Sequence, residues 1–134
     1  MGYEVDKTEQ QWREELTPDR FEVLRRAATE PAFSGSLLHV DKDGTFRCGG
    51  CGQVLFNTDA KFDSGSGWPS FDRAIPGTVE ERPDNSLFMR RTEIVCSRCG
   101  GHLGHVFDDG PTETGQRYCV NSLAIDFEPN AADA

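Results

Sequence analysis

The sequence predicts a single mainly β (α+β) domain over 1–134, with two short helices at its N-terminal end. Three observations lead to this fold class. The 134 residues suffice for one core of ordinary size. Helix-start signals and an apolar helical stripe are confined to about the first 34 residues. Beyond them, short apolar runs alternate with turn residues, as in strands. We expect a helical segment over 1–34, a β core over 35–127 and a flexible tail over 128–134.

Two capping patterns predict where the helices begin. Thr8 followed three residues later by Gln11 matches a capping box, which predicts a helix over about 9–16. Thr17 can cap a second helix with Pro18 at its first position, where the missing N–H of proline costs nothing. The second helix has an apolar stripe of Phe21, Leu24 and Ala28, and Pro31 lies just past its expected end.

Turn residues separate the expected strands. Asp41-Lys42-Asp43-Gly44 lies between the strand-like runs 38–40 and 45–48, which predicts a hairpin. Further strands are expected at 53–56, 87–90, 92–96 and 122–127.

The composition is acidic. Lys and Arg number 14 and Asp and Glu 23, which gives a net charge of −9. Nucleic acid and anionic membranes are bound through Lys and Arg, so we expect neither as a partner. No apolar run approaches the ~20 residues of a membrane span, and the charged N-terminus does not resemble a signal peptide. We expect a cytoplasmic protein, and a monomer because no helix has a heptad pattern.

Four of the five cysteines form two Cys-x-x-Cys-Gly segments, at Cys48, Cys51, Cys96 and Cys99. Two intervening residues let both sulfurs reach one tetrahedral ion, and four thiolates make a closed structural zinc site. A glycine after the second cysteine allows the positive φ of a tight loop. A redox dithiol, two disulfides and iron in place of zinc are the alternatives. A redox dithiol usually lies at the start of a helix. Disulfides do not suit a reducing compartment. Iron is held by the same tetrahedral set of thiolates, so it stays an alternative to zinc.

The fifth cysteine, Cys119, lies in an extended segment. Alternation places Arg117, Cys119 and Asn121 on one face, and a guanidinium beside a thiol favours the nucleophilic thiolate. A buried thiol that packs as a small apolar group is the alternative.

Histidines and an aromatic loop add to this pattern. His102 and His105 precede Asp108 and Asp109, and an imidazole is the usual proton donor or acceptor beside a reactive thiol. One of the acidic residues could orient a histidine or carry a proton itself. Trp68, in a loop rich in glycine and serine, is either an aromatic wall or part of the core. His39 is expected at the surface.

Together these segments resemble the methionine-R-sulfoxide reductases of the B type, and the resemblance covers nearly the whole chain. The matching motifs are 48–52, 61–65, 67–71, 96–99, 101–107, 109–111 and 117–122, with further similarity at 16–18 and 29–33. The resemblance implies a small fold of two antiparallel β-sheets and one structural zinc ion distant from the catalytic pocket. The zinc ligands that it implies are Cys48, Cys51, Cys96 and Cys99.

The resemblance also implies a reaction. Cys119 is the nucleophile that attacks the sulfoxide sulfur, and methionine and a Cys119 sulfenic acid result. His105 protonates the leaving oxygen with help from His102 or Asp109. The substrate is methionine-R-sulfoxide, free or in proteins.

The resemblance also implies supporting roles for four further residues. Trp68 and Phe107 bind the substrate, with Trp68 holding its methyl group. Arg117 helps to keep Cys119 as thiolate, and Asn121 completes the hydrogen-bond network.

Ser66 departs from a common pattern of the family. Many members carry cysteine between the two glycines of Ser-Gly-x-Gly-Trp-Pro, where it forms a disulfide with the oxidised nucleophile. With serine there, either thioredoxin or a small thiol attacks Cys119 directly, or the sequence is a Cys-to-Ser variant.

Two other classes of protein stay open from the sequence. A non-catalytic zinc module that binds a protein partner accounts for the Cys-x-x-Cys pairs but not for the surroundings of Cys119. Another zinc-stabilised thiol enzyme, acting on a small electrophile such as a thiol–aldehyde adduct, accounts for both.

Overall fold

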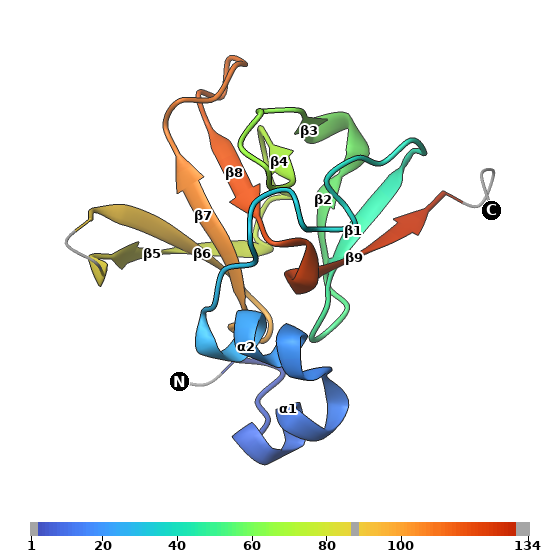
Figure 1. Ribbon diagram of the computed structural model, residues 1–134, viewed down its shortest axis with the longest axis vertical. Coiled ribbons are helices and arrows are strands. Elements are labelled where there is room, and N and C mark those ends of the chain that lie inside the picture. The colour runs from blue at the N-terminus through green and yellow to red at the C-terminus, as the bar shows by residue number, and fades with distance from the viewer. Residues whose placement is uncertain (1–2, 87–88, 131–134) are drawn as a thin grey trace.

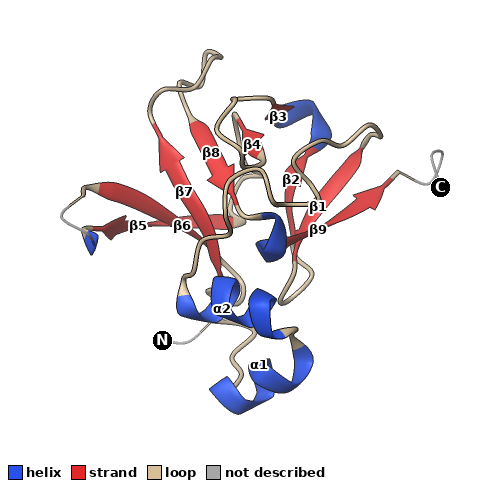
Figure 2. Ribbon diagram, viewed as in Figure 1, coloured by secondary structure: helices blue, strands red, loops and turns tan. Residues whose placement is uncertain are grey.

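The computed structural model describes residues 3–86 and 89–130, and it confirms the mainly β class. Two antiparallel sheets stand side by side, with two helices packed across one end (Figure 1, Figure 2). The smaller sheet has the order β2-β1-β9, with β1 Gly44–Cys48, β2 Val54–Asn57 and β9 Ile125–Pro129. The larger has the order β3-β4-β8-β7-β6-β5. Its strands are β3 Lys61–Phe62, β4 Ser70–Phe71, β5 Val79–Asp84, β6 Arg91–Cys96, β7 His102–Phe107 and β8 Arg117–Val120.

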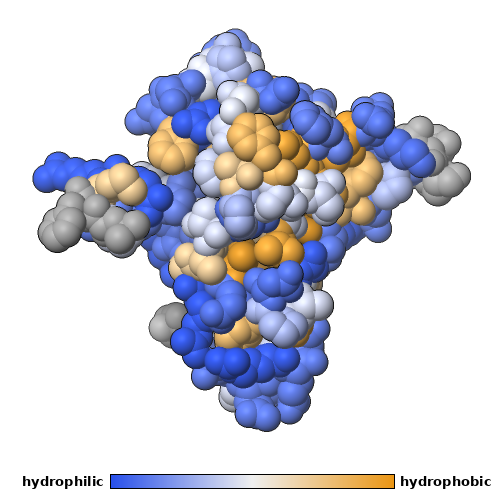
Figure 3. Space-filling view, viewed as in Figure 1, coloured by the Kyte–Doolittle hydropathy of each residue, from blue (hydrophilic) through white to orange (hydrophobic). Residues whose placement is uncertain are grey.

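Both helices begin at the residues that the capping patterns indicate. Helix α1, Glu9–Glu15, has the complete capping box of Thr8 and Gln11. Helix α2, Pro18–Arg26, starts after Thr17 and ends at Ala27, which adopts the left-handed conformation. Helix α2 buries Phe21 and Leu24 and contacts β7 and the short 3-10 helix η3, Ser122–Ala124. On the face that Figure 3 shows, the helical end of the molecule is mostly hydrophilic. Among the described residues, none of the helices combines the length and the apolar character that crossing a bilayer requires.

The predicted hairpin at 41–44 is wrong. Residues 38–43 form no strand, and β1 pairs instead with β2 and with β9 from the other end of the chain. The backbone carbonyl of Leu38 accepts a hydrogen bond from Lys61 Nζ at 2.6 Å in place of a ladder bond. The Asp-Gly pair marks the start of β1. The strands that pair with β1 are distant in sequence, so local patterns do not predict them.

Two other boundaries also differ from the expectations. Met89 and Arg90 are not in a strand, and Leu87 and Phe88 lie outside the described residues. The strand expected at 122–127 begins only at Ile125, because the preceding three residues form η3. It continues to Pro129, which pairs with Gly44, so residues 128 and 129 belong to the sheet rather than to the tail. Residues 131–134 lie outside the described part of the chain.

A cluster of three phenylalanines joins the two sheets. Phe46 of β1, Phe56 of β2 and Phe71 of β4 are fully buried, and the Phe56 and Phe71 rings stack with centroids 4.2 Å apart. The Phe46 ring meets Phe71 edge-on at 4.9 Å. Since aromatic side chains bury large areas in defined geometries, this cluster fixes β4 and, through its pairing, β8.

Candidate active site

Strand pairing sets Cys119 at the centre of the larger sheet. Cys119 lies opposite Ser70 of β4 on one side and opposite His105 of β7 on the other. Directly paired residues of antiparallel strands point to the same face, so the thiol and the imidazole share a face. Gly104 allows β7 to approach β8 closely, because a Cβ there would lie 2.0 Å from the Cys119 carbonyl oxygen.

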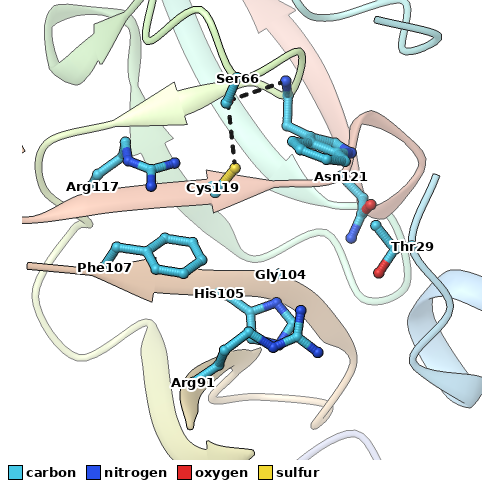
Figure 4. A pocket seen from close by; sticks show the side chains of 10 residues that line it. Thr29, Ser66, Arg91, Gly104, His105, Phe107, Arg117, Cys119 and Asn121 are labelled. Carbon is cyan, nitrogen blue, oxygen red and sulfur yellow. Dashed lines mark hydrogen bonds between the residues drawn. The ribbon is translucent and has the colours of Figure 1, made fainter. Parts of the chain in front are cut away.

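A cavity of about 270 Å³ opens on this face. Seven of the residues singled out from the sequence line it, namely Ser66, Trp68, His105, Phe107, Arg117, Cys119 and Asn121. Thr29, Arg91 and Gly104 complete its wall (Figure 4). The cavity therefore combines one thiol, one imidazole, two guanidinium groups and an aromatic surface.

Burial and polar neighbours act on the Cys119 thiol in opposite directions. Burial raises the pKa of Cys119, and this effect is the largest. A hydrogen bond with Ser66, the charge of Arg117 and a hydrogen bond with Ser70 act to lower the pKa, without overcoming burial. The Ser66 Oγ lies 3.7 Å from the Cys119 Sγ. The thiol is therefore mainly protonated at neutral pH, and Ser66 and Arg117 are the groups that favour its ionisation.

Arg117 is held by Asp109 and Phe107. Its Nε donates to Asp109 Oδ1 at 2.8 Å, and a second guanidinium nitrogen donates to Oδ2 at 3.1 Å. The guanidinium also lies over the Phe107 ring, 4.5 Å from its centroid. The Arg117 hydrogen bonds hold the pKa of Asp109 below its usual range, so this exposed carboxylate is ionised. Asp109 lies outside the wall of the Cys119 cavity and orients a residue that lines it.

His105 is bound by a carboxylate that the sequence patterns did not single out. Its Nε2 lies 2.8 Å from Asp84 Oδ2, at the end of β5. The same carboxylate accepts from Arg91 at 3.2 Å. The hydrogen bonds from His105 and Ser86 hold the pKa of Asp84 well below its usual range. The carboxylate at Nε2 holds the imidazole ring in place and leaves Nδ1 as the nitrogen for a substrate.

His102 lies behind His105 rather than in the cavity wall. It is 4% exposed, and its ring is 5.6 Å from the His105 ring. Its Nδ1 lies 2.7 Å from Glu93 Oε2, and its buried Nε2 has no hydrogen-bond partner in the described part of the chain. Burial lowers the pKa of His102, although Glu93 acts in the opposite direction. His102 is therefore neutral at neutral pH and packs behind His105.

The side chains of Asn121 and Trp68 are both hydrogen-bonded to the backbone of Glu30. The buried Asn121 side chain accepts a hydrogen bond from the Glu30 N–H at 3.0 Å and donates to Leu103 O at 3.1 Å. The Trp68 Nε1 donates to the Glu30 carbonyl at 2.9 Å. The Glu30 side chain accepts from the Leu123 N–H at 2.9 Å. Glu30 thus fixes one side of the cavity, and its role depends on contacts between distant segments that no local pattern reveals.

The four Cys-x-x-Cys sulfurs lie together, outside the wall of the Cys119 cavity. They are all within 4.8 Å of one another, with 3.6 Å between Cys48 and Cys99 and 3.5 Å between Cys51 and Cys96. A tetrahedral ion with Zn–S bonds of about 2.3 Å places its sulfurs about 3.8 Å apart, so the cluster fits such an ion. Four thiolates also leave no open position for a substrate. The four cysteines could therefore hold one metal ion.

The loops around the sulfurs have the expected geometry. Gly52 and Gly100, which follow the second cysteine of each pair, have φ of 83° and 75°, as the Cys-x-x-Cys-Gly pattern predicts. The Gly50 N–H donates to Cys48 Sγ at 3.3 Å, and the Gly101 N–H donates to Cys99 Sγ at 3.4 Å. Such bonds stabilise thiolates, the form in which cysteine binds metal.

His39 is exposed, as expected.

Comparisons with known proteins agree with this arrangement. The family described as "SelR domain" matches residues 16–129. A protein of Leptospira interrogans named "Peptide methionine sulfoxide reductase MsrB" is 52% identical over 129 residues, covering 96% of this chain and 98% of its own. A protein of the same name from Bradyrhizobium diazoefficiens is 56% identical over 126 residues, covering 93% and 91%. One from Methanosarcina mazei is 52% identical over 124 residues, covering 92% and 89%.

A solved structure, "Crystal Structure of Mis18 'Yippee-like' Domain", is similar with a TM-score of 0.53. It is 18% identical, and the match covers 65% of this chain and 96% of that chain, so the likeness shows the fold alone. The scaffold by itself therefore does not identify an activity. The family match and the three relatives extend over nearly the whole chain, including the cavity around Cys119 and the four-cysteine cluster, and they show that the chain belongs to the methionine-R-sulfoxide reductase B family.

Proposed function

We propose that this protein reduces methionine-R-sulfoxide, free or in proteins, to methionine, with Cys119 as the nucleophile. The observation that carries the proposal is the cavity in which the Cys119 thiol meets His105, Trp68 and Phe107. A thiol, a proton donor and an apolar aromatic surface suit a small apolar group with one polar oxygen. A non-catalytic zinc module has no use for such a cavity.

The reaction is a two-electron exchange between two sulfur atoms. The Cys119 thiolate attacks the sulfoxide sulfur, an S–S bond forms, and the sulfoxide oxygen takes a proton. The S–S bond and the S–O bond of the substrate then break as the oxygen forms a bond to the Cys119 sulfur, so the thioether is released and Cys119 becomes a sulfenic acid. The substrate sulfur is reduced and the cysteine sulfur is oxidised by the same two electrons.

His105 is the proton donor in this proposal. Its Nε2 is bound to the ionised Asp84, which holds the ring in place, so Nδ1 is the nitrogen that gives a proton to the sulfoxide oxygen. His102 is buried and neutral, so it supports the position of His105 rather than donating. Asp109 is ionised and bound to Arg117, and therefore acts through Arg117.

Zinc is the ion that we propose for the four-cysteine cluster. Four thiolates in a tetrahedral arrangement are its usual structural ligands, and the ion would hold the ends of β1 and β6 together. It supplies stability and takes no part in the reaction at Cys119.

The regeneration of Cys119 needs an external thiol in this proposal. The other four cysteines belong to the metal cluster, and Ser66 occupies the position from which a resolving cysteine would act. We propose thioredoxin or a small thiol as reductant, a cytoplasmic location that supplies such thiols, and a monomeric state.

A chiral assay tests the proposed activity. Racemic methionine sulfoxide is incubated with the protein and dithiothreitol, and both epimers are followed by chromatography. We expect only the R epimer to disappear. Consumption of neither epimer favours the zinc-module alternative, and turnover of thiol–aldehyde adducts without sulfoxide reduction favours the second alternative.

Replacing Trp68 with alanine is expected to lower kcat/KM by about 30-fold, because an aromatic anchor in a pocket contributes about 2 kcal/mol. Metal content should not change, because Trp68 is not in contact with the four-cysteine cluster. Trp68→Phe keeps the aromatic surface but loses the hydrogen bond to Glu30 O, so an intermediate loss is expected. Unchanged kinetics in Trp68→Ala would remove this residue from the substrate site.

The pKa of Cys119 gives a pH dependence with a defined sign. Burial raises this pKa, so the thiolate fraction is small at neutral pH and grows as pH rises through the pKa. Alkylation of Cys119 by iodoacetamide should therefore accelerate into the alkaline range. Arg117→Gln removes a charge that favours the thiolate, so it should raise the pKa further and slow alkylation at neutral pH. Faster alkylation in this variant would contradict the assignment of Arg117.

A further inference from the structure

A second cavity lies beside the one that holds Cys119. Its volume is about 440 Å³, and its wall consists of Phe62 of β3, the loop 63–66, Asp109, Pro111 and Arg117. The substrate-reduction step proposed above does not use this space. Its wall carries two carboxylates, Asp63 and Asp109, whereas the first cavity has none.

Ser66 and Arg117 form a shared wall between the two cavities, since both residues line each of them. Cys119 lines the first cavity, and its Sγ lies 3.7 Å from Ser66 Oγ. In the view of Figure 4, Ser66 is on one side of Cys119, and Phe107 and His105 are on the other. Ser66 and Arg117 therefore separate the second cavity from the nucleophile.

The geometry of displacement at sulfur favours an attack on the Cys119 sulfenic acid from the Ser66 side. The sulfenic oxygen comes from a substrate in the first cavity, so the new S–O bond points into that cavity. Displacement at sulfur is in line, with the incoming nucleophile opposite the leaving oxygen. A thiolate that attacks the Cys119 sulfenic acid must therefore come from the direction of Ser66.

We propose that the second cavity is the entry site for the thiol that regenerates Cys119, and that it favours small neutral or positively charged thiols. This inference rests on the proposed function. The thiolate attacks the Cys119 sulfur, an S–S bond forms, the S–O bond breaks, and the oxygen leaves as water after taking a proton. A second thiolate then attacks the sulfur of the bound thiol, which releases a disulfide and the Cys119 thiolate.

Charge gives the cavity its selectivity. Arg117 and Asp109 neutralise each other as a bidentate pair, which leaves Asp63 as the remaining charge of the lining. Asp63 is exposed, and its Oδ1 accepts from the Gly65 N–H at 3.0 Å, which fixes the loop. Lys61 interacts electrostatically with Asp63 and lines a neighbouring cavity together with it, but Lys61 Nζ donates to Leu38 O at 2.6 Å and is not part of the wall of the second cavity. One charge about 6 Å away in water changes a rate roughly three-fold.

The test uses preformed Cys119 sulfenic acid and three thiols of similar size. Cysteamine carries a positive charge, 2-mercaptoethanol none, and 2-mercaptoethanesulfonate a negative charge. Rate constants per thiolate at low salt should fall in that order, by roughly three-fold at each step. Asp63→Asn keeps the hydrogen bond to Gly65 but removes the charge, so the ratio between the outer two thiols should fall from roughly ten to two or less. Glu14→Gln on α1, at the opposite end of the molecule from β3 (Figure 1), should keep the ratio.

A ligand bound in the first cavity distinguishes entry of the thiol through the substrate site from entry through the second cavity. Saturating N-acetyl-methionine amide should leave the rate of regeneration nearly unchanged, because the thiol does not pass through the substrate site. Strong inhibition by this compound, a ratio that Asp63→Asn does not change, or regeneration by thioredoxin alone and by none of the three thiols would each overturn the proposal. Failure to form sulfenic acid at all would instead count against the proposed function.

Discussion

Replacing Cys119 with serine is expected to lower methionine sulfoxide reduction by about 10⁴-fold or more, to the limit of detection. A serine hydroxyl is far less acidic than a thiol, and it cannot accept the sulfoxide oxygen in a reversible two-electron step. Cys119 is half-buried and Ser66 and Ser70 surround it, so a hydroxyl fits the site. The measurement is the rate of formation of methionine from the R epimer.

Folding and metal content are the controls for this variant. The Cys119→Ser protein should melt within a few degrees of the unchanged protein and bind the same amount of zinc. Substantial residual turnover would remove Cys119 from its role, and a large loss of stability would make the activity result uninformative about catalysis.

Replacing Cys96 with serine is expected to remove the metal ion and to destabilise the folded state, whereas Cys119→Ser is expected to change neither. Cys96 is fully buried at the end of β6, and its Sγ lies 3.5 Å from Cys51 Sγ. Structural zinc contributes about 10–16 kcal/mol of apparent binding free energy in zinc-finger peptides. A loss of even about 5 kcal/mol corresponds to a fall of roughly 20 °C in Tm for a domain of this size.

Metal analysis and a thermal melt measure this effect, and removal of the ion by a strong chelator should reproduce it. The two variants make the same Cys-to-Ser change, so each is a matched control for the other. A Cys96→Ser protein with unchanged Tm and no zinc would show that the four-cysteine cluster is not a structural metal site.

Local sequence patterns predict the features of this protein that depend on neighbouring residues. The capping box at Thr8, the Pro18 helix start and the two Cys-x-x-Cys-Gly loops are all found where the patterns place them. In each case a few adjacent residues satisfy their own hydrogen bonds or carry the ligands themselves. The extended segment around Cys119 is also found, as β8, although the strands that pair with it are not set by neighbouring residues.

Contacts between distant strands could not be predicted in this way. The acidic residues next to His105 in sequence are Asp108 and Asp109, yet its partner is Asp84 of β5, 21 positions away. That contact depends on the order β7-β6-β5 and on the register of those strands. The same holds for Glu93 with His102, where the β6–β7 register shifts between Ile94 and Val95. Edge strand β5 was missed because it is polar and contains Pro83, which an edge tolerates.

The most direct test of the account is a single turnover without reductant. The zinc-loaded protein receives one equivalent of either epimer of methionine sulfoxide, and methionine, the intact protein mass and the mass of the Cys119 peptide are measured. We predict that the R epimer yields one equivalent of methionine and adds one oxygen atom to the Cys119 peptide, whereas the S epimer does neither. Methionine formation without oxygen on Cys119, an intramolecular disulfide in its place, or equal reaction of the S epimer would contradict it.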